Sequence, residues 1–279
     1  MAVETIAVGL KFPEGPVFDK LGHLYVCEMQ RKQLTRISPD GTTEKYLDTG
    51  GVPNGAIRGL DSRLIVCDNT LKAIIAVTVE PGEHEKKIEL ITKAFGPSDT
   101  PFKGPNDVVS DRAGNLYFTD PVQSSKKNPV GGVYRYDAKT KTTTQLINNF
   151  AFPNGIVLSD DEKTLFIAET EAQSIWAYAL NADGSLGQRQ LAGELREGHG
   201  PDGIALDSKG RLIAAWFGGK CLAVFEKGKL AEKIDIPDQN PTNIEFGGTK
   251  HDELYITGSK DGTVLKLKWT CPGQKMAAD

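Results

Sequence analysis

The pattern of hydrophobic and polar residues repeats six times along the chain. Each copy begins with a proline and a polar residue, and two short β-type runs follow, joined by a turn rich in Asp, Gly or Lys. Such runs, bounded by turn residues, predict strands rather than helices. The copies recur every 40 to 52 residues and read FPEGPVFDKLGHLYVCE from Phe12, VPNGAIRGLDSRLIVCD from Val52, GPNDVVSDRAGNLYFTDP from Gly104, FPNGIVLSDDEKTLFIAE from Phe152, GPDGIALDSKGRLIAAW from Gly200 and NPTNIEFGGTKHDELYITG from Asn240.

Further runs complete each copy, such as QLTRIS and TEKYLD in the first. Four strands in each of six copies predict an all-β fold, a six-bladed β-propeller of antiparallel blades, as one domain over residues 1–279. The sixth copy ends early, because only TCPGQKMAAD follows TVLKLKW. We therefore expect the N-terminal run VETIAVG to supply the missing strand of the last blade and close the ring, which removes a free edge.

The propeller topology predicts where each part of the repeat lies. The first strand of a blade runs beside the central channel, so the proline motifs should converge on one channel mouth, together with the loops between second and third strands. The longest of these loops, 120–132, is expected to form a wall or a lid. The D-x-x-G turns at Asp19, Asp111 and Asp207 should lie at the opposite face as ordinary hairpin turns.

Composition removes several function classes. Hydrophobic residues make up 39% and charged residues 25%, with 30 glycines and 15 prolines, as in a turn-rich globular protein. The net charge of -4 gives no basic surface for nucleic acid or an anionic membrane. Glu4 and the lack of a long apolar run argue against a signal peptide or membrane span. The four cysteines form no C-x-x-C pair, so we expect free thiols and a cytoplasmic location.

Polar residues of the repeated motif should form a ring at the mouth. Carboxylate and amide oxygens without His or Cys suit Ca²⁺, Mg²⁺ or Mn²⁺ better than zinc. Glu14 is a poor turn former and is costly near the axis unless it is paired or metal-bound. For Asn54, stabilisation of the local turn is an alternative explanation. The ring comprises Glu14, Asn54, Asn106, Asn154 and Asp202, with Thr242 and Asn243 in the sixth copy.

The motifs EGP at Glu14, PND at Asn106, FPNG at Asn154 and GPDG at Asp202 resemble those of the gluconolactonase and regucalcin (senescence marker protein) family, over nearly the whole chain. The resemblance implies a lactonase with one divalent cation held by Glu14, Asn154 and Asp202. It also implies that Asn106 contacts substrate or a metal-bound water. We expect Ca²⁺ as the cation, with Mn²⁺, Mg²⁺ or Zn²⁺ as alternatives.

In that reading, the cation polarises the lactone carbonyl and Asp202 takes a proton from the attacking water. The substrate is a small lactone or ester. Sugar-lactone members often carry an arginine where this chain has Gly104, so a more apolar or aromatic lactone is favoured. Residues near the mouth that we expect to contact substrate are Asn54, Phe102, Lys103, Asn106, His199 and Trp216, with Phe12 and Phe217 as further aromatic residues.

Two alternatives stay open. The same metal site could hydrolyse aryl esters or phosphotriesters, as in related propellers. Alternatively, the protein is a non-catalytic binding propeller whose metal is structural. Serine hydrolase, phosphate-loop and dinucleotide motifs are absent from the sequence. Among the histidines, His23 and His251 fall in far-face turns and His84 in a polar loop, so His199 alone is expected at the mouth.

Overall fold

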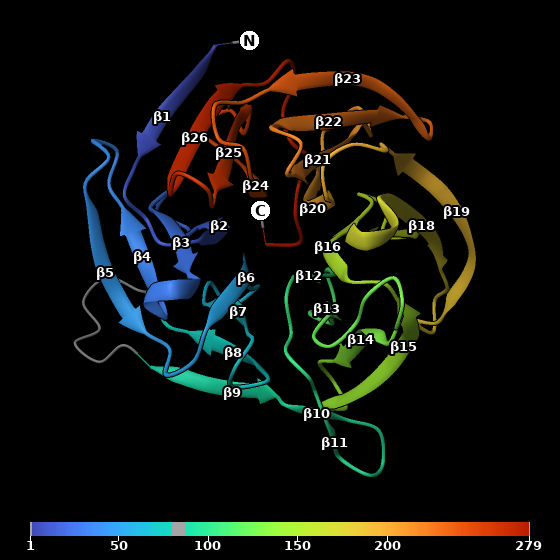
Figure 1. Ribbon diagram of the computed structural model, residues 1–279. Helices are drawn as coiled ribbons and strands as arrows, with labels where there is room; N and C mark the ends of the chain where they lie inside the picture. The colour runs from blue at the N-terminus through green and yellow to red at the C-terminus, as the bar shows by residue number, and fades with distance from the viewer. Residues whose placement is uncertain (1, 80–86, 279) are drawn as a thin grey trace.

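Six antiparallel sheets form a ring around a common axis (Figure 1). The computed structural model describes residues 2–79 and 87–278, so Met1, Asp279 and His84, which the sequence pattern assigns to a polar loop, lie outside the described residues. Each of these six sheets has four strands and is one blade, and the described residues also form one two-stranded sheet. This arrangement confirms the six-bladed propeller that the repeat predicts.

In the first five blades the strands follow one another in chain order from the axis outward (Figure 1). The first blade contains β2 (Pro13–Phe18), β3 (Leu24–Glu28), β4 (Gln33–Ile37) and β5 (Thr43–Asp48). The second contains β6 (Pro53–Arg58), β7 (Leu64–Asp68), β8 (Ala73–Val77) and β9 (Ile88–Thr92), and the third β12 (Val108–Ser110), β13 (Leu116–Asp120), β14 (Gly131–Asp137) and β15 (Thr142–Phe150). The fourth contains β16 (Pro153–Leu158), β17 (Thr164–Glu169), β18 (Ser174–Leu180) and β19 (Leu186–Glu194), and the fifth β20 (Gly200–Leu206), β21 (Leu212–Phe217), β22 (Cys221–Glu226) and β23 (Lys229–Asp235). The sixth contains β24 (Pro241–Gly247), β25 (Glu253–Gly258), β26 (Thr263–Lys268) and the N-terminal β1 (Val3–Ala7).

The N-terminal strand closes the ring as expected. Strand β1 pairs antiparallel with β26, from Val3 opposite Leu267 to Ala7 opposite Val264. Without β1, the backbone groups of β26 would form an exposed edge. The last blade is thereby built from both ends of the described chain.

The core lies between neighbouring blades rather than within one. Second strands such as β3 and β7 are buried along their whole length, because a sheet covers each of their faces. One core cluster joins Tyr25 and Cys27 of the first blade to Val66 and Ile75 of the second. Packing of sheet on sheet explains why these strands are continuously apolar instead of alternating.

The D-x-x-G turns are hairpin turns, as predicted. In each, one carboxylate oxygen of the aspartate accepts two backbone N–H groups, for example those of Ala113 and Asn115 at Asp111. Asp19 and Asp207 hold their turns in the same way. The glycine closing the turn at Asp111, Gly114, has φ of 84°, a conformation that glycine tolerates best.

Three features of the chain lie outside the regular blade pattern. A short hairpin of β10 (Ala94–Phe95) and β11 (Thr100–Pro101) extends from the ring beside the third blade (Figure 1). Two 3₁₀ turns, η1 (Met29–Arg31) and η2 (Thr170–Ala172), connect second and third strands in the first and fourth blades. After β26, the C-terminal segment crosses toward the axis, where the Gln274 side chain donates to the Leu158 carbonyl (2.8 Å).

Two expectations from the sequence concern the state of the cysteines and the lack of a membrane span. All four cysteines are free, and Cys27, Cys67 and Cys221 are buried, as expected for thiols in strands. The described residues contain no helix with the length and apolar character that a membrane crossing requires.

Candidate active site at one end of the ring

The polar residues of the repeated motif converge because the first strand of each blade is irregular after its proline. In five blades the pairing between first and second strands shifts register at this position, as between Pro53 and Ala56 or between Pro153 and Ile156. A bulge of this kind redirects side chains and is common beside active sites. Glu14, Asn54, Asn154 and Asp202 therefore point to a shared space.

The glycine after the polar residue lets neighbouring first strands approach each other closely. A Cβ atom at Gly155 would lie 2.3 Å from the Asp202 carbonyl oxygen, and one at Gly15 would lie 2.3 Å from the Asn54 carbonyl oxygen. Gly15 also has φ of 41°. No other residue fits either position without backbone movement, which explains the glycine in the repeated motif.

These residues line one cavity of about 220 Å³. The cavity brings together eight of the residues expected near the mouth, and further side chains complete its wall. The expected residues are Phe12, Glu14, Asn54, Asn106, Asn154, His199, Asp202 and Phe217; the others include Met29, Val122, Phe152 and Thr170.

Three residues expected to contact substrate do not line this cavity. Phe102 is 1% exposed and packs against Phe118 and Tyr134 in the core between the second and third blades. Trp216 is fully buried, and its indole N–H donates to the Glu197 carbonyl (2.7 Å). The Lys103 ammonium donates to the Val130 carbonyl (3.1 Å). The structure thus corrects their expected placement, because packing and the long loop engage their side chains elsewhere.

Asp107 is a buried carboxylate that the motif analysis did not select, although it directly follows Asn106. Its two carboxylate oxygens accept the backbone N–H groups of Val108 (3.0 Å) and Ile156 (3.3 Å). Burial raises the pKa of Asp107 to about 7. The sequence signal that could have identified Asp107 was its place as a second polar residue at the start of an apolar strand.

Three carboxylates influence one another at this end of the ring. Burial, followed by repulsion from Asp202 and Asp107, raises the pKa of Glu14 well above its ordinary value. Burial and repulsion from Asp107 likewise raise the pKa of Asp202. No lysine or arginine of the described residues lines the cavity. Ionisation of all three would therefore concentrate negative charge without a protein cation to balance it.

A bound divalent cation would fit this donor set. Among the described residues, no three His, Cys, Asp or Glu side chains are grouped closely enough to hold an ion by themselves. Amide oxygens would have to contribute. Asn154 lies beside Asp202, and the hydrogen bond from its side chain lowers the pKa of the Asp202 carboxyl. Oxygen-only coordination by carboxylates and amides suits a hard cation such as Ca²⁺.

Metal-free protein is expected to lose stability as the pH rises. Folded Asp107 keeps its proton up to about pH 7, whereas the unfolded chain releases it near the ordinary pKa of 3.8. This stability is fully present below about pH 4 and is lost between about pH 4 and 7, at a cost of roughly 4 kcal/mol. A cation would offset that loss, so Ca²⁺ should raise the melting temperature more at pH 8 than at pH 5. Melts with Ca²⁺ or EDTA at both pH values test this, and equal shifts would contradict it.

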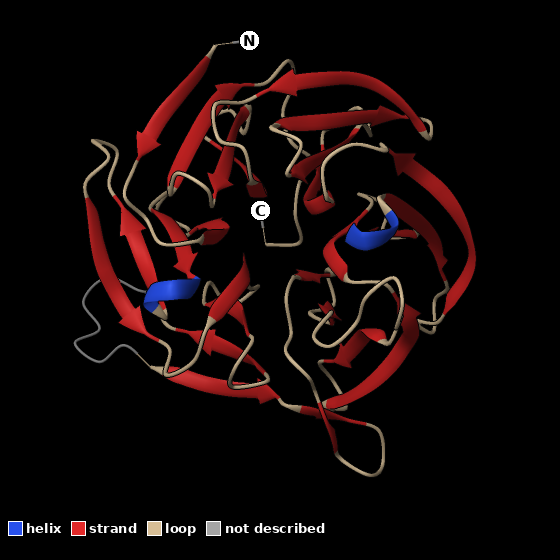
Figure 2. Cartoon of the chain, viewed as in Figure 1, coloured by secondary structure: helices blue, strands red, loops and turns tan. Residues whose placement is uncertain are grey.

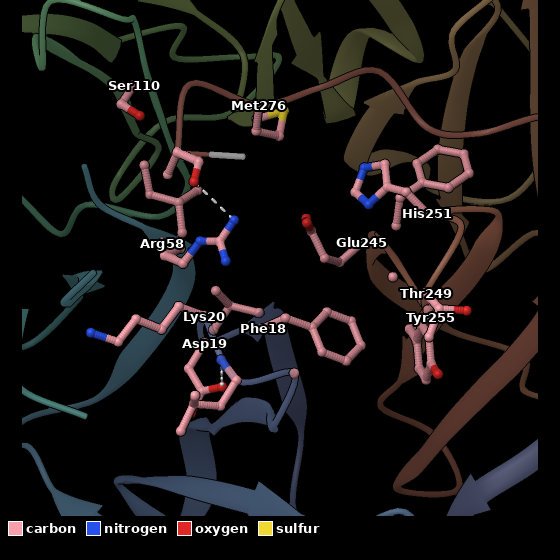
Figure 3. Close-up of a pocket in the computed structure, with 18 residues that line it drawn as sticks. Phe18, Asp19, Lys20, Arg58, Ser110, Glu245, Thr249, His251, Tyr255 and Met276 are labelled. Atoms are coloured by element: carbon pink, nitrogen blue, oxygen red, sulfur yellow. Dashed lines mark hydrogen bonds between the residues drawn. The ribbon is translucent and has the colours of Figure 1, made fainter. Parts of the chain in front are cut away.

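A larger cavity of about 550 Å³ lies at the opposite end of the ring (Figure 3). It is lined by the hairpin turn at Asp19, by Arg58, Glu245 and His251, and by the C-terminal segment. The Arg58 guanidinium donates to the Ala278 carbonyl (3.0 Å), and Asp19 already accepts N–H groups of its own turn. The converging carboxylates favour the smaller cavity as the candidate active site.

Comparison with known proteins identifies relatives across most of the chain. A family model described as the SMP-30/Gluconolactonase/LRE-like region matches residues 12–260. Lactonase drp35 of Staphylococcus aureus is 31% identical over 237 residues, which cover 81% of this chain and 70% of that protein. Lactonase drp35 of Staphylococcus epidermidis is 30% identical over 239 residues, with the same two coverages of 81% and 70%.

Solved structures share the fold. A gluconolactonase from Xanthomonas campestris has a TM-score of 0.81 at 24% identity, covering 95% of this chain and 89% of its own. A calcium-binding protein, regucalcin, from Agrobacterium tumefaciens has a TM-score of 0.79 at 19% identity, covering 99% of this chain and 98% of its own. At these identities the likeness establishes the propeller architecture.

Proposed function

The chain belongs to the SMP-30/gluconolactonase/LRE-like family, and from this premise we propose that it hydrolyses a lactone in the cavity lined by Glu14, Asn106 and Asp202. The staphylococcal relatives are lactonases and the Xanthomonas neighbour is a gluconolactonase, which supports lactone hydrolysis as the reaction. The observation that carries the proposal is the convergence of buried Glu14, Asp107 and Asp202 at one end of the ring, beside a cavity with apolar walls.

Glu14, Asn154 and Asp202 are proposed to hold one divalent cation, Ca²⁺ before Mn²⁺, Mg²⁺ or Zn²⁺. A structural neighbour is a calcium-binding protein, which supports Ca²⁺ as the first of these. Bound there, the cation would supply a Lewis acid for the lactone carbonyl. The negative charge of three neighbouring carboxylates, unbalanced by any lysine or arginine of the described cavity lining, is the feature that favours cation binding.

Asp202 is proposed to be the general base. Water adds to the carbonyl carbon while one of its protons passes to the Asp202 carboxylate. The ring C–O bond then breaks, and the same proton goes to the departing ring oxygen, which gives a hydroxy carboxylic acid. Burial raises the pKa of Asp202 in the metal-free site, and a cation bound to one of its oxygens would lower the pKa again, which would keep the carboxylate ionised and able to accept the proton. Asn106 and His199 line the cavity, where they can orient the lactone.

The substrate is proposed to carry an apolar body. A Cβ atom at Gly104 would lie 2.5 Å from the Val122 side chain and 2.8 Å from the Asn69 amide nitrogen, so the arginine that sugar-lactone members often have there would require both side chains to move. Phe12, Phe152 and Phe217 line the cavity instead. Aromatic walls bind apolar surface and offer few partners to sugar hydroxyls.

Metal removal is the direct test of this function. Protein stripped with EDTA is expected to lose lactone hydrolysis, and Ca²⁺ restored alone should recover it, because the developing negative charge on the carbonyl oxygen is then stabilised again. Initial rates on lactones, aryl esters and phosphotriesters, with Ca²⁺, Mn²⁺, Mg²⁺ and Zn²⁺ restored singly, measure both metal and substrate preference. EDTA added together with excess Ca²⁺ is the matched control.

Each class of outcome separates the competing functions. Full activity after complete metal removal, verified by elemental analysis, would refute the metal-dependent mechanism. Turnover of aryl esters or phosphotriesters in preference to every lactone would show that this site catalyses the alternative hydrolase reaction. Metal binding without turnover of any substrate would favour a non-catalytic binding propeller. The cytoplasmic location stays a prediction, consistent with four free cysteines.

A further inference from the structure

The loops before the first strand have the same hydrogen-bond pattern in the first and fourth blades. In the first blade, Lys11 N–H donates to the Glu28 carboxylate (2.7 Å), and Met29 N–H donates to the Phe12 carbonyl (3.2 Å). In the fourth, Ala151 N–H donates to Glu169 (2.7 Å), and Thr170 N–H donates to the Phe152 carbonyl (3.0 Å). Each loop is thus held by a buried glutamate at the end of the second strand.

The second and third blades carry aspartate at this position, and their loops differ. Asp68 accepts the N–H of Val52 (2.8 Å), and Asp120 accepts the N–H of Gly104 (2.8 Å). These donors directly precede the proline of their blades. Asp120 also accepts the N–H of Lys103 (2.7 Å), one residue earlier. The two glutamates accept this earlier N–H, from Lys11 and Ala151, and not the N–H of Phe12 or Phe152 directly before the proline. The longer side chain therefore corresponds to a different path of the loop.

The backbone before the proline differs accordingly. Phe12 has φ of 54° and Phe152 has φ of 65°, in the left-handed region that bulky residues avoid. Val52 and Gly104 have no such positive φ. Backbone strain of this kind concentrates at functional sites and persists where surrounding contacts enforce it. Here the enforced conformation brings both phenylalanines, but neither Val52 nor Gly104, to the lining of the candidate active site.

The two loops lie on opposite sides of the axis. Figure 2 shows this through their 3₁₀ turns, η1 and η2, which directly follow Glu28 and Glu169. The phenylalanines are only partly buried, whereas Glu28 is fully buried and Glu169 is 8% exposed. Glu28 also accepts from Arg31 (2.7 Å) and Glu169 from the Trp176 indole (2.7 Å). The glutamates are anchored inside the protein, and the rings face the cavity.

We propose that Glu28 and Glu169 are positioning residues whose side-chain length sets the left-handed backbone of Phe12 and Phe152, so that the two rings select substrates with an apolar body. This specificity rests on the proposed lactone hydrolysis. The glutamates act through the loops and not on the reacting atoms. Phe12 and Phe152 are the groups that contact the substrate, on opposite walls of one cavity.

Replacement of Phe12 or Phe152 by alanine tests whether their rings select substrates with an apolar body. Phe12→Ala and Phe152→Ala should each raise KM for a phenyl-substituted γ-butyrolactone by on the order of tenfold, as expected for lost apolar contact. The ratio of the KM for unsubstituted γ-butyrolactone to the KM for the phenyl-substituted lactone should fall by a similar factor, because the unsubstituted lactone has no phenyl group whose contact is lost. Val52→Ala is the matched control, because Val52 holds the same position in the repeat but does not line the cavity. Equal changes for both lactones would overturn the selection.

A crossed pair of variants tests the role of side-chain length. Glu28→Gln keeps the length and an acceptor for Lys11 N–H, so it should preserve the preference for the phenyl-substituted lactone. Glu28→Asp keeps the charge but should accept the N–H of Phe12, as Asp68 and Asp120 accept those of Val52 and Gly104, so it should lose the preference as Phe12→Ala does. A Glu28→Asp protein with the wild-type preference would overturn the positioning role. Should Glu28→Asp fail to fold, Glu169→Asp with Phe152→Ala as its reference repeats the comparison in the fourth blade.

A binding measurement separates this inference from the proposed function. Calorimetry compares 3-phenylcyclopentanone with cyclopentanone, carbocyclic probes that cannot be hydrolysed. Wild-type protein should prefer the phenyl probe by about tenfold, and Phe12→Ala, Phe152→Ala and Glu28→Asp should lose this preference with Ca²⁺ affinity unchanged. Absence of lactone turnover in wild type would refute the proposed function alone. An unchanged probe preference in all three variants would refute the positioning inference, whatever the turnover.

Discussion

Asp202→Asn is expected to lower kcat for lactone hydrolysis by roughly 10³-fold, within the range typical of losing a positioned general base. Asparagine keeps the size of the side chain and one oxygen donor but cannot accept the proton from water. Steady-state kinetics on purified variant and wild type, both saturated with Ca²⁺, measure the effect. Burial and repulsion from Asp107 raise the pKa of Asp202 and so disfavour its charged form, and a neutral side chain of the same size is therefore not expected to unfold the protein.

Asp111→Asn provides the matched control. Asp111 is 8% exposed, close to the value for Asp202, but it holds a hairpin turn at the opposite face. Its replacement should lower the melting temperature and leave kcat unchanged. Calorimetric titration of Ca²⁺ into both variants separates loss of the base from loss of the cation. Near-wild-type turnover by an Asp202→Asn protein that still binds Ca²⁺ would assign the base elsewhere, with Asp107 as the next carboxylate to test.

Deletion of residues 1–10 is expected to lower the melting temperature by more than about 10 °C or to prevent soluble expression. The deletion removes β1 and exposes the edge of β26. It also removes Ala7 and Leu10, which are buried at 4% and 3% exposure in one core cluster. Lost burial and lost strand pairing together amount to several kcal/mol, and for a chain of this size each 1 kcal/mol shifts the melting temperature by about 2–4 °C.

Glu4→Ala is the control for this deletion, since it changes β1 without removing the strand. Glu4 pairs with Lys266 (3.2 Å) at 65% side-chain exposure, and an exposed ion pair contributes less than about 1 kcal/mol. Thermal melts followed by circular dichroism compare the two variants with wild type. A deletion variant that melts at the wild-type temperature would show that the ring does not depend on β1 for closure.

The repeated motif was sufficient to predict the blades because strand pairing in a propeller is local. Each strand pairs with the next one in the chain, so the turn residues and β-type runs around Asp111 or Asp207 carry the needed information in a short stretch. The missing strand of the last blade followed from the same pattern, since the run from Val3 had no partner in its own repeat. The pairing of β1 with β26 bears out that expectation.

The candidate site was predictable only where residues share a repeat position. Glu14, Asn154 and Asp202 converge because each follows a proline at the same point of its blade. Nearness in sequence was not an equivalent guide. Phe102 precedes the third motif by few residues, yet the core between two blades buries it. The pKa of Asp107 likewise depends on burial by neighbouring blades, which no single repeat encodes.

The sequence by itself determined the number of blades, the closure of the ring and the polar residues grouped at one end, because these follow from periodicity and local pairing. Only the tertiary structure decided which aromatic residues border the cavity. That outcome depends on side-chain direction, which a buried carboxylate sets through the backbone of Phe12 and Phe152. Trp216, expected at the mouth, is buried instead, and its indole N–H donates to the backbone carbonyl of Glu197. Contacts between distant segments fix such directions, and a linear pattern does not contain them.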